Sequence, residues 1–213
     1  LSDGLHREIN VHRYKHADMA DLERSLSRIP EGDPTLIVTD GVFSMEGDVA
    51  NYPKIVELGE RYGAPVYLDE AHAIGVVGST GRGTPEHWRD QGIDVGTPDI
   101  TMCTFSKSFG SIGGFVAGEK PVMDYVQHHA RSLIFSASMA PPQVAAVLEA
   151  LRIMEEEPWR ATRMKEISKK MIDGFRSLGF DVGITETPII PLIIGDDKRT
   201  FMFWKTMFDM GVY

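Results

Sequence analysis

Cysteine is almost absent from this sequence, which holds a single one, Cys103. A lone cysteine cannot close a disulfide within the chain, and it excludes a metal site built from several thiolates. This usage is consistent with a reducing compartment. Because Cys103 lies in the apolar run 100–104, we expect a buried structural thiol there and not a reactive one.

Long apolar runs and dense basic runs are also missing. The longest apolar stretches, such as 189–194, are far shorter than the roughly 20 residues that a membrane-spanning helix needs, and no signal-like segment opens the chain. The net charge is −9, and no cluster of Lys and Arg is long enough to follow a phosphate backbone. We therefore predict a cytoplasmic protein with no transmembrane segment and no nucleic-acid partner.

The composition that remains is that of a folded globular protein, with 42% hydrophobic and 25% charged residues among 213. This length suffices for one large domain, or for one domain and part of a second. Short apolar runs alternate with helical patterns, which favours an α/β fold. The alternation predicts strands at 36–39, 65–68, 100–104 and 112–117, and helices from Tyr52 to near Gly63, at 120–131 and at 142–154.

Charge and a proline interrupt the helical pattern at Glu155-Glu156-Glu157-Pro158, where we place a domain boundary. Residues 1–157 would form a large domain. Residues 158–213 would begin a smaller α+β domain, with a long helix to about residue 178, strands near Phe180 and at 189–194, and a helix from Thr200.

Acidic residues and a histidine follow the second predicted strand, in the run Leu68-Asp69-Glu70-Ala71-His72. The same letters occur in the Mg²⁺-binding acidic box of helicase ATPases. An ATPase also needs a glycine-rich loop ending in Gly-Lys-Ser/Thr, and no lysine of this sequence stands in that pattern. The ATPase interpretation is therefore disfavoured.

A lysine follows the next predicted strand, in the run Thr104-Phe105-Ser106-Lys107-Ser108. Pyridoxal phosphate needs a lysine that forms an imine, an acid beside its ring nitrogen, and hydroxyl or amide groups around its phosphate. Lys107, Asp69 and the flanking serines supply all three. Lys107 could instead be a solvated surface lysine, Asp69 a cap and His72 a hydrogen-bonded core residue. A lysine in a Ser/Gly loop between apolar strands favours the cofactor interpretation.

Several longer motifs resemble the α-oxoamine synthase family over nearly the whole chain. They are GVFSMEGD at 41–48, DEAHAIGVVG at 69–78, GRGT at 81–84, TFSKSFGSIGGFVAG at 104–118 and FSAS at 135–138. The resemblance implies a fold-type I, aminotransferase-like large domain with a mainly parallel sheet that binds pyridoxal 5'-phosphate, plus part of a smaller C-terminal domain. Enzymes of this family join an amino acid to an acyl-CoA with loss of CO₂.

The resemblance also assigns roles to individual residues. Lys107 would be the imine lysine, Asp69 the partner of the ring nitrogen, and His72 and Ser44 the groups near the phenolic oxygen, with Lys107, His72 and Asp69 acting in catalysis. Ser44 could also be a simple turn residue. No metal site is expected, because the histidines show no metalloprotease spacing.

Further contacts would surround the cofactor phosphate. Thr104 and Ser106 would bind it within the chain. Ser136 and Ala137 match the segment that such enzymes donate to the neighbouring subunit, so the resemblance implies a homodimer with these two residues acting in trans.

The substrates follow from the resemblance as well. DEAHAIG, TFSKSFGSIGGF and TETPIIPL look most like the bacterial serine palmitoyltransferases, which favours L-serine and palmitoyl-CoA. Glycine C-acetyltransferase and aminooxononanoate synthase are alternatives in the family, and a catalytically silent partner subunit is another, although Lys107 is retained. The family's ring-stacking residue and carboxylate-binding arginine have no counterpart here, so we expect an internal fragment of a longer protein.

Overall fold

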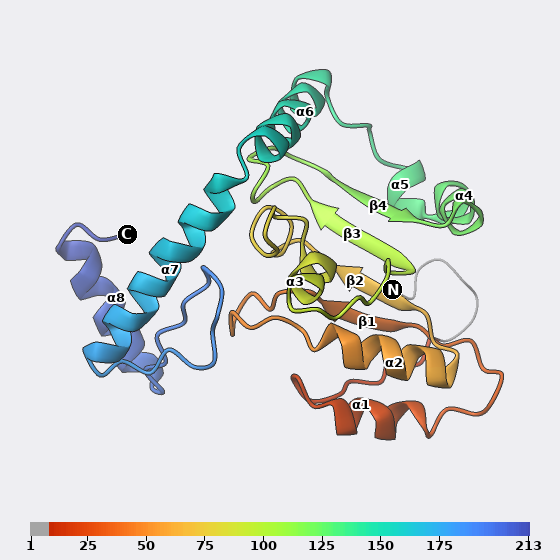
Figure 1. The fold of residues 1–213 in the computed structure, drawn as a ribbon, viewed down its shortest axis with the longest axis horizontal. Coiled ribbons are helices and arrows are strands. Elements are labelled where there is room, and N and C mark those ends of the chain that lie inside the picture. The colour runs from red at the N-terminus through yellow and green to blue at the C-terminus, as the bar shows by residue number, and fades with distance from the viewer. Residues whose placement is uncertain (1–8) are drawn as a thin grey trace.

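Four strands form one sheet in the order β1-β2-β3-β4 (Figure 1). The computed structural model describes residues 9–213. The strands are β1 (Ile37–Asp40), β2 (Val66–Asp69), β3 (Ile100–Thr104) and β4 (Gly114–Gly118). The first three are parallel, and β4 runs antiparallel to β3. The predicted α/β fold with a mainly parallel sheet is confirmed, and each predicted strand of the first 118 residues lies within two residues of its expected place.

Helix α2 (Tyr52–Tyr62) makes the crossover between β1 and β2, as the sequence predicts. The Asn51 side chain accepts a hydrogen bond from the backbone N–H of Lys54 at its start, and Pro53 lies in its first turn. Gly63 ends it with φ of 63°, a left-handed conformation that glycine adopts at little cost. Two chemical signals at the ends therefore fix the length of the helix.

Helix α1 (Met19–Leu26) packs against α2 and was not predicted. Asp18 caps its start by accepting a hydrogen bond from the backbone N–H of Asp21. With eight residues, α1 is too short to be stable alone, so its packing on α2 stabilises it. The main core lies between these two helices and one face of the sheet. Its buried members are Leu22, Leu26, Ile37, Ala50, Tyr52, Ile55, Leu58, Ala64, Val66 and Leu68.

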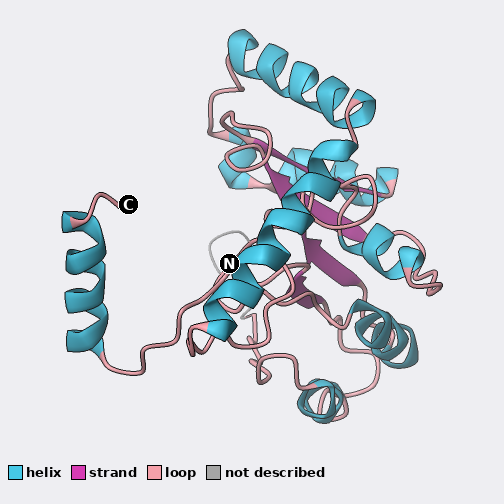
Figure 2. Ribbon diagram, turned by 60° about the vertical axis from the view of Figure 1, so that its left-hand side comes forward, coloured by secondary structure: helices cyan, strands magenta, loops and turns pink. Residues whose placement is uncertain are grey.

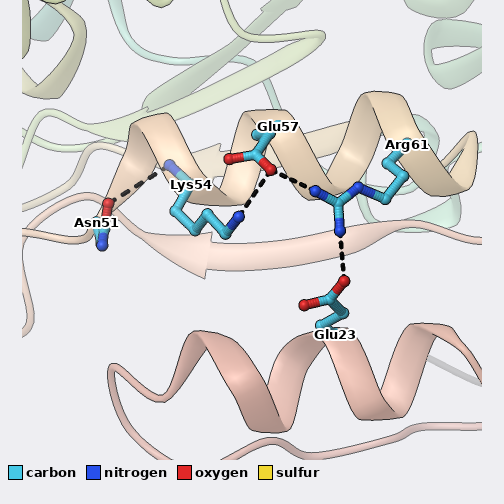
Figure 3. A network of polar contacts seen from close by, with 5 residues as sticks. All are labelled: Glu23, Asn51, Lys54, Glu57 and Arg61. Carbon is cyan, nitrogen blue, oxygen red and sulfur yellow. Dashed lines mark hydrogen bonds and ion pairs between the residues drawn. The ribbon is translucent and has the colours of Figure 1, made fainter.

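A polar network joins the outer surfaces of α1 and α2 (Figure 3). Arg61 contacts Glu23 of α1 and Glu57 of its own helix, and Lys54 lies 2.7 Å from the same Glu57 carboxylate. These side chains are at least one-third exposed, so each ion pair contributes only about 0.2–1 kcal/mol. The apolar contact, and not this network, holds the two helices together.

The two faces of the sheet differ in how well they are covered. Ile37 is 3% exposed, whereas its neighbour Val38 is 56% exposed. Because side chains alternate along a strand, Asp40 and Asp69 lie on the same open side as Val38. The ends of β1 and β2 thus deliver two carboxylates to the less covered face.

Five helices follow the sheet, and they bury little of their surface. They are α4 (Lys120–His129), α5 (Arg131–Ile134), α6 (Pro141–Glu156), α7 (Trp159–Ser177) and α8 (Asp197–Asp209). Within the described chain, α4, α5 and α8 bury no residue. Figure 2 shows α8 standing apart from the sheet. None of the helices formed by residues 9–213 is both long enough and apolar enough to span a bilayer.

Three expectations for the second half need correction. The segments near Phe180 and at 189–194 form no strand, and α8 begins at Asp197 instead of Thr200. Pro188 and Pro191 lack the N–H that a central strand would donate, and a single backbone hydrogen bond, from Ile193 to the carbonyl of Asp181, joins the two segments. The earlier start of α8 follows from its cap, in which Asp196 accepts from the backbone N–H of Arg199.

The boundary predicted at 155–158 coincides with the break between α6 and α7. Whether 1–157 and 158–213 fold as separate domains remains a prediction, and residues 1–8 lie outside the described part of the chain. Several contacts cross the break: the Lys165 amine of α7 donates to the carbonyl of Gly78 at 2.7 Å, and the Thr187 hydroxyl donates to the carbonyl of Gly47 at 2.8 Å.

A buried carboxyl, that of Glu70, ties the end of β2 to helix α3 (Thr84–Asp90), which was also not predicted. The backbone N–H of Thr84 donates to its Oε2 at 2.8 Å. Gly41 and Gly83 pack so closely on it that an added Cβ would lie 2.1 and 1.8 Å from its oxygens. Burial raises the pKa of Glu70 to about 7. Its protonated form is therefore the one that suits the fold.

We predict that Glu70→Gln makes stability less dependent on pH. The native state holds the Glu70 proton up to about pH 7, whereas an unfolded chain releases it near 4.5. The native protein therefore loses stability as the pH rises between these values. Glutamine stays neutral, so the variant should exceed the wild type by less than about 1 kcal/mol at pH 5 and by about 3 kcal/mol at pH 8.

Urea unfolding of the full-length protein at the two pH values measures this difference. Glu60→Gln, on the exposed surface of α2, is the control and should leave the pH dependence of the wild type in place. Equal pH dependence in Glu70→Gln and the wild type would show that Glu70 is ionised in the folded protein.

Candidate cofactor site at the strand ends

Two aspartates meet where β1 and β2 end. Asp40 and Asp69 are direct partners in the parallel register, so their side chains lie next to each other on the open face. Burial and the neighbouring Asp69 charge raise the pKa of Asp40. This is the expected behaviour of two close carboxyl groups, of which one tends to keep its proton.

Asp69 keeps part of its carboxylate available. Its Oδ1 accepts a hydrogen bond from the backbone N–H of Ala71 at 2.9 Å, which fixes the orientation of the group. Within residues 9–213, no hydrogen bond to Oδ2 is recorded. An oriented carboxylate with one open oxygen fits the role predicted for Asp69, that of partner to a protonated ring nitrogen.

His72 lies in the turn that follows β2 and is partly buried. The backbone N–H groups of Ala73 and Ile74 both donate to the carbonyl of Glu70, which closes this turn. Burial lowers the pKa of His72, and the charge of Lys107 lowers it further, while Asp40 and Asp69 act in the opposite direction. The charges of the lysine and of both aspartates therefore all act on the His72 imidazole.

Lys107 lies on the loop that connects β3 to β4. The backbone closes this loop through hydrogen bonds from Phe105 to the carbonyl of Gly113 and from Gly110 to the carbonyl of Lys107. The Lys107 side chain is exposed, and within the described chain no hydrogen bond or ion pair is recorded for its amine. Such an amine is available to a bound molecule.

A direct contact holds the Lys107 loop against the segment that carries His72. The hydroxyl of Ser108 donates to the carbonyl of Ile74 at 2.7 Å. Gly75, with φ of 82°, makes room for this approach, since a Cβ there would lie 2.6 Å from the Cβ of Ser108. A larger residue at position 75 would therefore push the two loops apart.

Two hydroxyl groups predicted to bind phosphate lie together before the lysine. The side-chain oxygens of Thr104 and Ser106 are 2.9 Å apart, and the backbone N–H of Ser106 donates to the Thr104 hydroxyl. Thr104 is also held by the carbonyl of Gly113 at 3.2 Å. The pair and the Lys107 amine thus belong to one short stretch of chain.

Ser44 lies on an exposed turn after β1. The backbone N–H of Gly47 donates to the carbonyl of Phe43 across the turn. His16 lies 3.0 Å from the buried carboxylate of Asp48 at the end of the turn, and its ring contacts Phe43 edge-on. His16, Glu46 and Asp48 bring possible metal ligands within 4.8 Å of one another, but the His16–Asp48 pair accounts for this arrangement without a metal.

Ser136 and Ala137 do not join the other predicted site residues. They are exposed in the segment after α5, and no hydrogen bond within residues 9–213 connects them to the strand ends. Their neighbours Leu133, Ile134 and Phe135 are 55%, 49% and 78% exposed. Whether Ser136 and Ala137 act in a neighbouring subunit remains a prediction.

Asp40 is the one acid at this edge that the sequence analysis missed. It ends a strand immediately before a glycine, as Asp69 ends a strand before Glu70, so the rule that identified Asp69 would have found it. Cys103, in contrast, is buried as predicted, and burial raises the pKa of its thiol to about 11.

The donor set fits pyridoxal phosphate. An available lysine amine, an oriented carboxylate with an open oxygen, a partly buried imidazole and a hydroxyl pair lie on neighbouring loops at one end of the sheet. These are the groups that the aldehyde, the ring nitrogen, the phenolic oxygen and the phosphate of this cofactor require.

Known proteins are similar in sequence to this chain over almost its full length. The chain is 47% identical to serine palmitoyltransferase of Bacteroides thetaiotaomicron over 201 residues, which are 94% of this chain and 50% of that protein. It is 43% identical to 8-amino-7-oxononanoate synthase of Thermosipho melanesiensis over 200 residues, again 94% and 50%. The chain thus spans about half the length of these curated relatives.

Solved structures share the fold. A serine palmitoyltransferase from S. paucimobilis with a bound PLP-myriocin aldimine has a TM-score of 0.86 and 33% identity, covering 94% of this chain and 52% of that one. A high-resolution structure of SPT with a PLP internal aldimine has a TM-score of 0.85 and 34% identity, covering 94% and 50%.

A family model matches the sequence as well, over residues 5–213, and its description is aminotransferase class I and II. Together with the relatives, this match confirms the resemblance predicted from the motifs. The chain belongs to the aminotransferase class I and II family.

Proposed function

We propose that this chain is the cofactor-binding part of an acyltransferase that condenses L-serine with palmitoyl-CoA and releases CO₂ and CoA. One observation carries the proposal: the Ser108–Ile74 hydrogen bond holds the Lys107 loop beside the segment that bears Asp69 and His72. Family membership and the solved relatives confirm the prediction that the cofactor is pyridoxal phosphate. A cytoplasmic location is part of the proposal and agrees with the single buried cysteine.

Each side chain has a defined task in this reaction. When bound, pyridoxal phosphate supplies an electron sink for negative charge at the α-carbon of the amino acid. The Lys107 amine would hold the cofactor, and it would also accept the proton of the substrate α-carbon. The Asp69 carboxylate holds the proton of the ring nitrogen. His72 and Ser44 would contact the phenolic oxygen, and Thr104 and Ser106 the phosphate.

The balance of the reaction defines its product. The α-carbon of serine bonds to the acyl carbon of palmitoyl-CoA as CoA leaves, and the serine carboxyl group departs as CO₂. A proton then returns to the α-carbon, and Lys107 is the side chain placed to deliver it. The product is 3-ketodihydrosphingosine. The alternative within the group is 8-amino-7-oxononanoate synthase, the name of relatives at up to 43% identity.

The first prediction concerns the substrates. In the full-length enzyme, CoA release should be fastest with L-serine and palmitoyl-CoA among serine, glycine and alanine paired with acetyl- or palmitoyl-CoA. The thiol assay of released CoA measures this directly, and Lys107→Ala is the inactive control. A clear preference for glycine with acetyl-CoA would assign the enzyme to the glycine C-acetyltransferases instead.

The second prediction separates Asp69 from Lys107. Asp69→Ala keeps the lysine but removes the partner of the ring nitrogen, so exchange of the serine α-proton with solvent should slow by about a hundredfold, as for a shift of roughly two pK units. Lys107→Ala should still bind the cofactor, but borohydride should no longer fix it to the chain. Proton exchange by NMR and mass spectrometry after reduction provide the measurements. Wild-type exchange in Asp69→Ala would contradict the assignment.

The third prediction tests the homodimer, in which Ser136 and Ala137 reach the cofactor of the partner subunit. The exposed run 133–135 supports this proposal, because a large apolar surface is usually covered in an assembly. Subunits with Ser136→Asp or Lys107→Ala should each be inactive alone. Statistical coexpression should restore about a quarter of wild-type activity, since half of the dimers are mixed and each has one intact site. No recovery would show that Ser136 does not act in trans.

A further inference from the structure

A segment from the far end of the chain, residues 185–189, closes on the turn that carries Ser44. The Thr187 hydroxyl donates to the carbonyl of Gly47 at 2.8 Å. The backbone N–H of Glu186 donates to the same oxygen at 3.4 Å. The Thr185 hydroxyl lies 3.2 Å from this oxygen and also contacts the carbonyl of Ile189. One carbonyl group of the turn therefore has three polar groups of this segment within hydrogen-bond distance.

The contact is buried and tightly fitted. Thr185 and Thr187 are 4% and 2% exposed, which is unusual for residues outside the helices and strands. Gly47 has φ of 75°, and a Cβ there would lie 2.2 Å from the carbonyl oxygen of Ile189 and 2.4 Å from the Thr185 hydroxyl. Only glycine therefore fits against the segment at this position.

Gly47 in turn fixes the position of Ser44. Its backbone N–H donates to the carbonyl of Phe43 at 2.9 Å, and Phe43 donates to the carbonyl of Asp48 at 3.0 Å. Ser44 lies between these closing bonds. Since the Gly47 carbonyl is held from outside, the plane of its peptide group, and with it the path of the turn, depends on residues 185–187.

A second contact reaches the segment that bears His72. Ile189 packs against a buried cluster made of Val42, Val49, Ala73 and Val77. Val42 and Val49 pair across the base of the Ser44 turn, and Ala73 is the residue after His72. The single segment 185–189 thus supports both residues that the proposed function places at the phenolic oxygen of the cofactor.

We propose that residues 185–189 position Ser44 and His72 for the cofactor, with Thr187 as the positioning residue that acts through the Gly47 carbonyl. This inference rests on the proposed function for the identity of the ligand. It adds a dependence of cofactor binding on a segment that lies 78 residues after Lys107 and 116 residues after Asp69 in the sequence. Thr187 does not touch the cofactor in this scheme, so its loss should affect binding and the cofactor's environment, and not the bond to Lys107.

The test compares three variants of the full-length protein. Thr187→Val keeps the shape of the side chain but removes the hydroxyl donor, and Thr187→Ser restores that donor. Ser168→Ala is the matched control, because it removes an equally buried hydroxyl that donates to the carbonyl of Met164 within α7, away from the turn. Any general loss of stability from a missing buried hydrogen bond should appear in both Thr187→Val and the control.

Two readouts distinguish positioning from stability. In the protein without cofactor, hydrogen exchange of the peptide covering residues 42–49 should rise only in Thr187→Val. In titrations with pyridoxal phosphate, the same variant should bind about fivefold more weakly, as expected for the loss of one hydrogen bond, and the pH midpoint of the bound cofactor's absorption should shift. Thr187→Ser should return the hydrogen exchange, the affinity and the pH midpoint towards those of the wild type.

The outcomes separate this inference from the proposed function. If the wild-type protein binds no pyridoxal phosphate, the proposed function fails, whereas the exchange measurement still reports on the Thr187–Gly47 contact. If the wild type binds the cofactor and Thr187→Val matches it in affinity, pH midpoint and exchange, the positioning role is wrong. Equal effects in Thr187→Val and Ser168→Ala would show that the Thr187 hydroxyl only stabilises the fold. That result would also overturn the positioning role.

Discussion

The in-register pairing of β1 with β2 is the constraint on which the site depends. Parallel strands all point the same way, so their carboxyl ends reach one edge of the sheet. The pairing of Asp40 with Asp69 sets how far each strand extends and on which face each carboxyl group lies. A slip of either strand by one residue would turn the aspartate of that strand into the core face. The hydrophobic core between α2 and the sheet thus also determines where the carboxyl groups of Asp40 and Asp69 lie.

The lysine reaches this edge by a different route. Because β4 is antiparallel to β3, the chain turns back at the strand ends and leaves residues 105–113 there as a loop. The Ser108–Ile74 hydrogen bond and the small size of Gly75 then bring this loop against the His72 segment. Hairpin geometry supplies the location of Lys107, and one side-chain contact supplies its orientation towards the neighbouring loop.

Local signals predicted the parts of the molecule that local forces determine. The Asn51 cap and Gly63 fixed the bounds of α2, and the apolar runs fixed the strands. Local sequence signals did not predict the structure correctly where contacts with residues distant in sequence determine it. Helix α1 needs its contact with α2, and 189–194 looks like a strand but has no neighbouring strand in the described chain and contains Pro191. Of the site, motif resemblance supplied the residues, and the strand register shows that Asp40 is the partner of Asp69.

Electrostatics explains why these groups can crowd together at one edge. Two carboxylates, a protonated histidine and a lysine would strongly perturb one another if all were charged at close range. Burial and Asp69 favour the neutral form of Asp40, and burial and Lys107 favour the neutral form of His72. Both shifts reduce the repulsion between like charges at this edge. A neutral imidazole can still hydrogen-bond a phenolic oxygen. The same arrangement that relieves repulsion in the fold therefore also prepares the site for a ligand that carries both positive and negative charge.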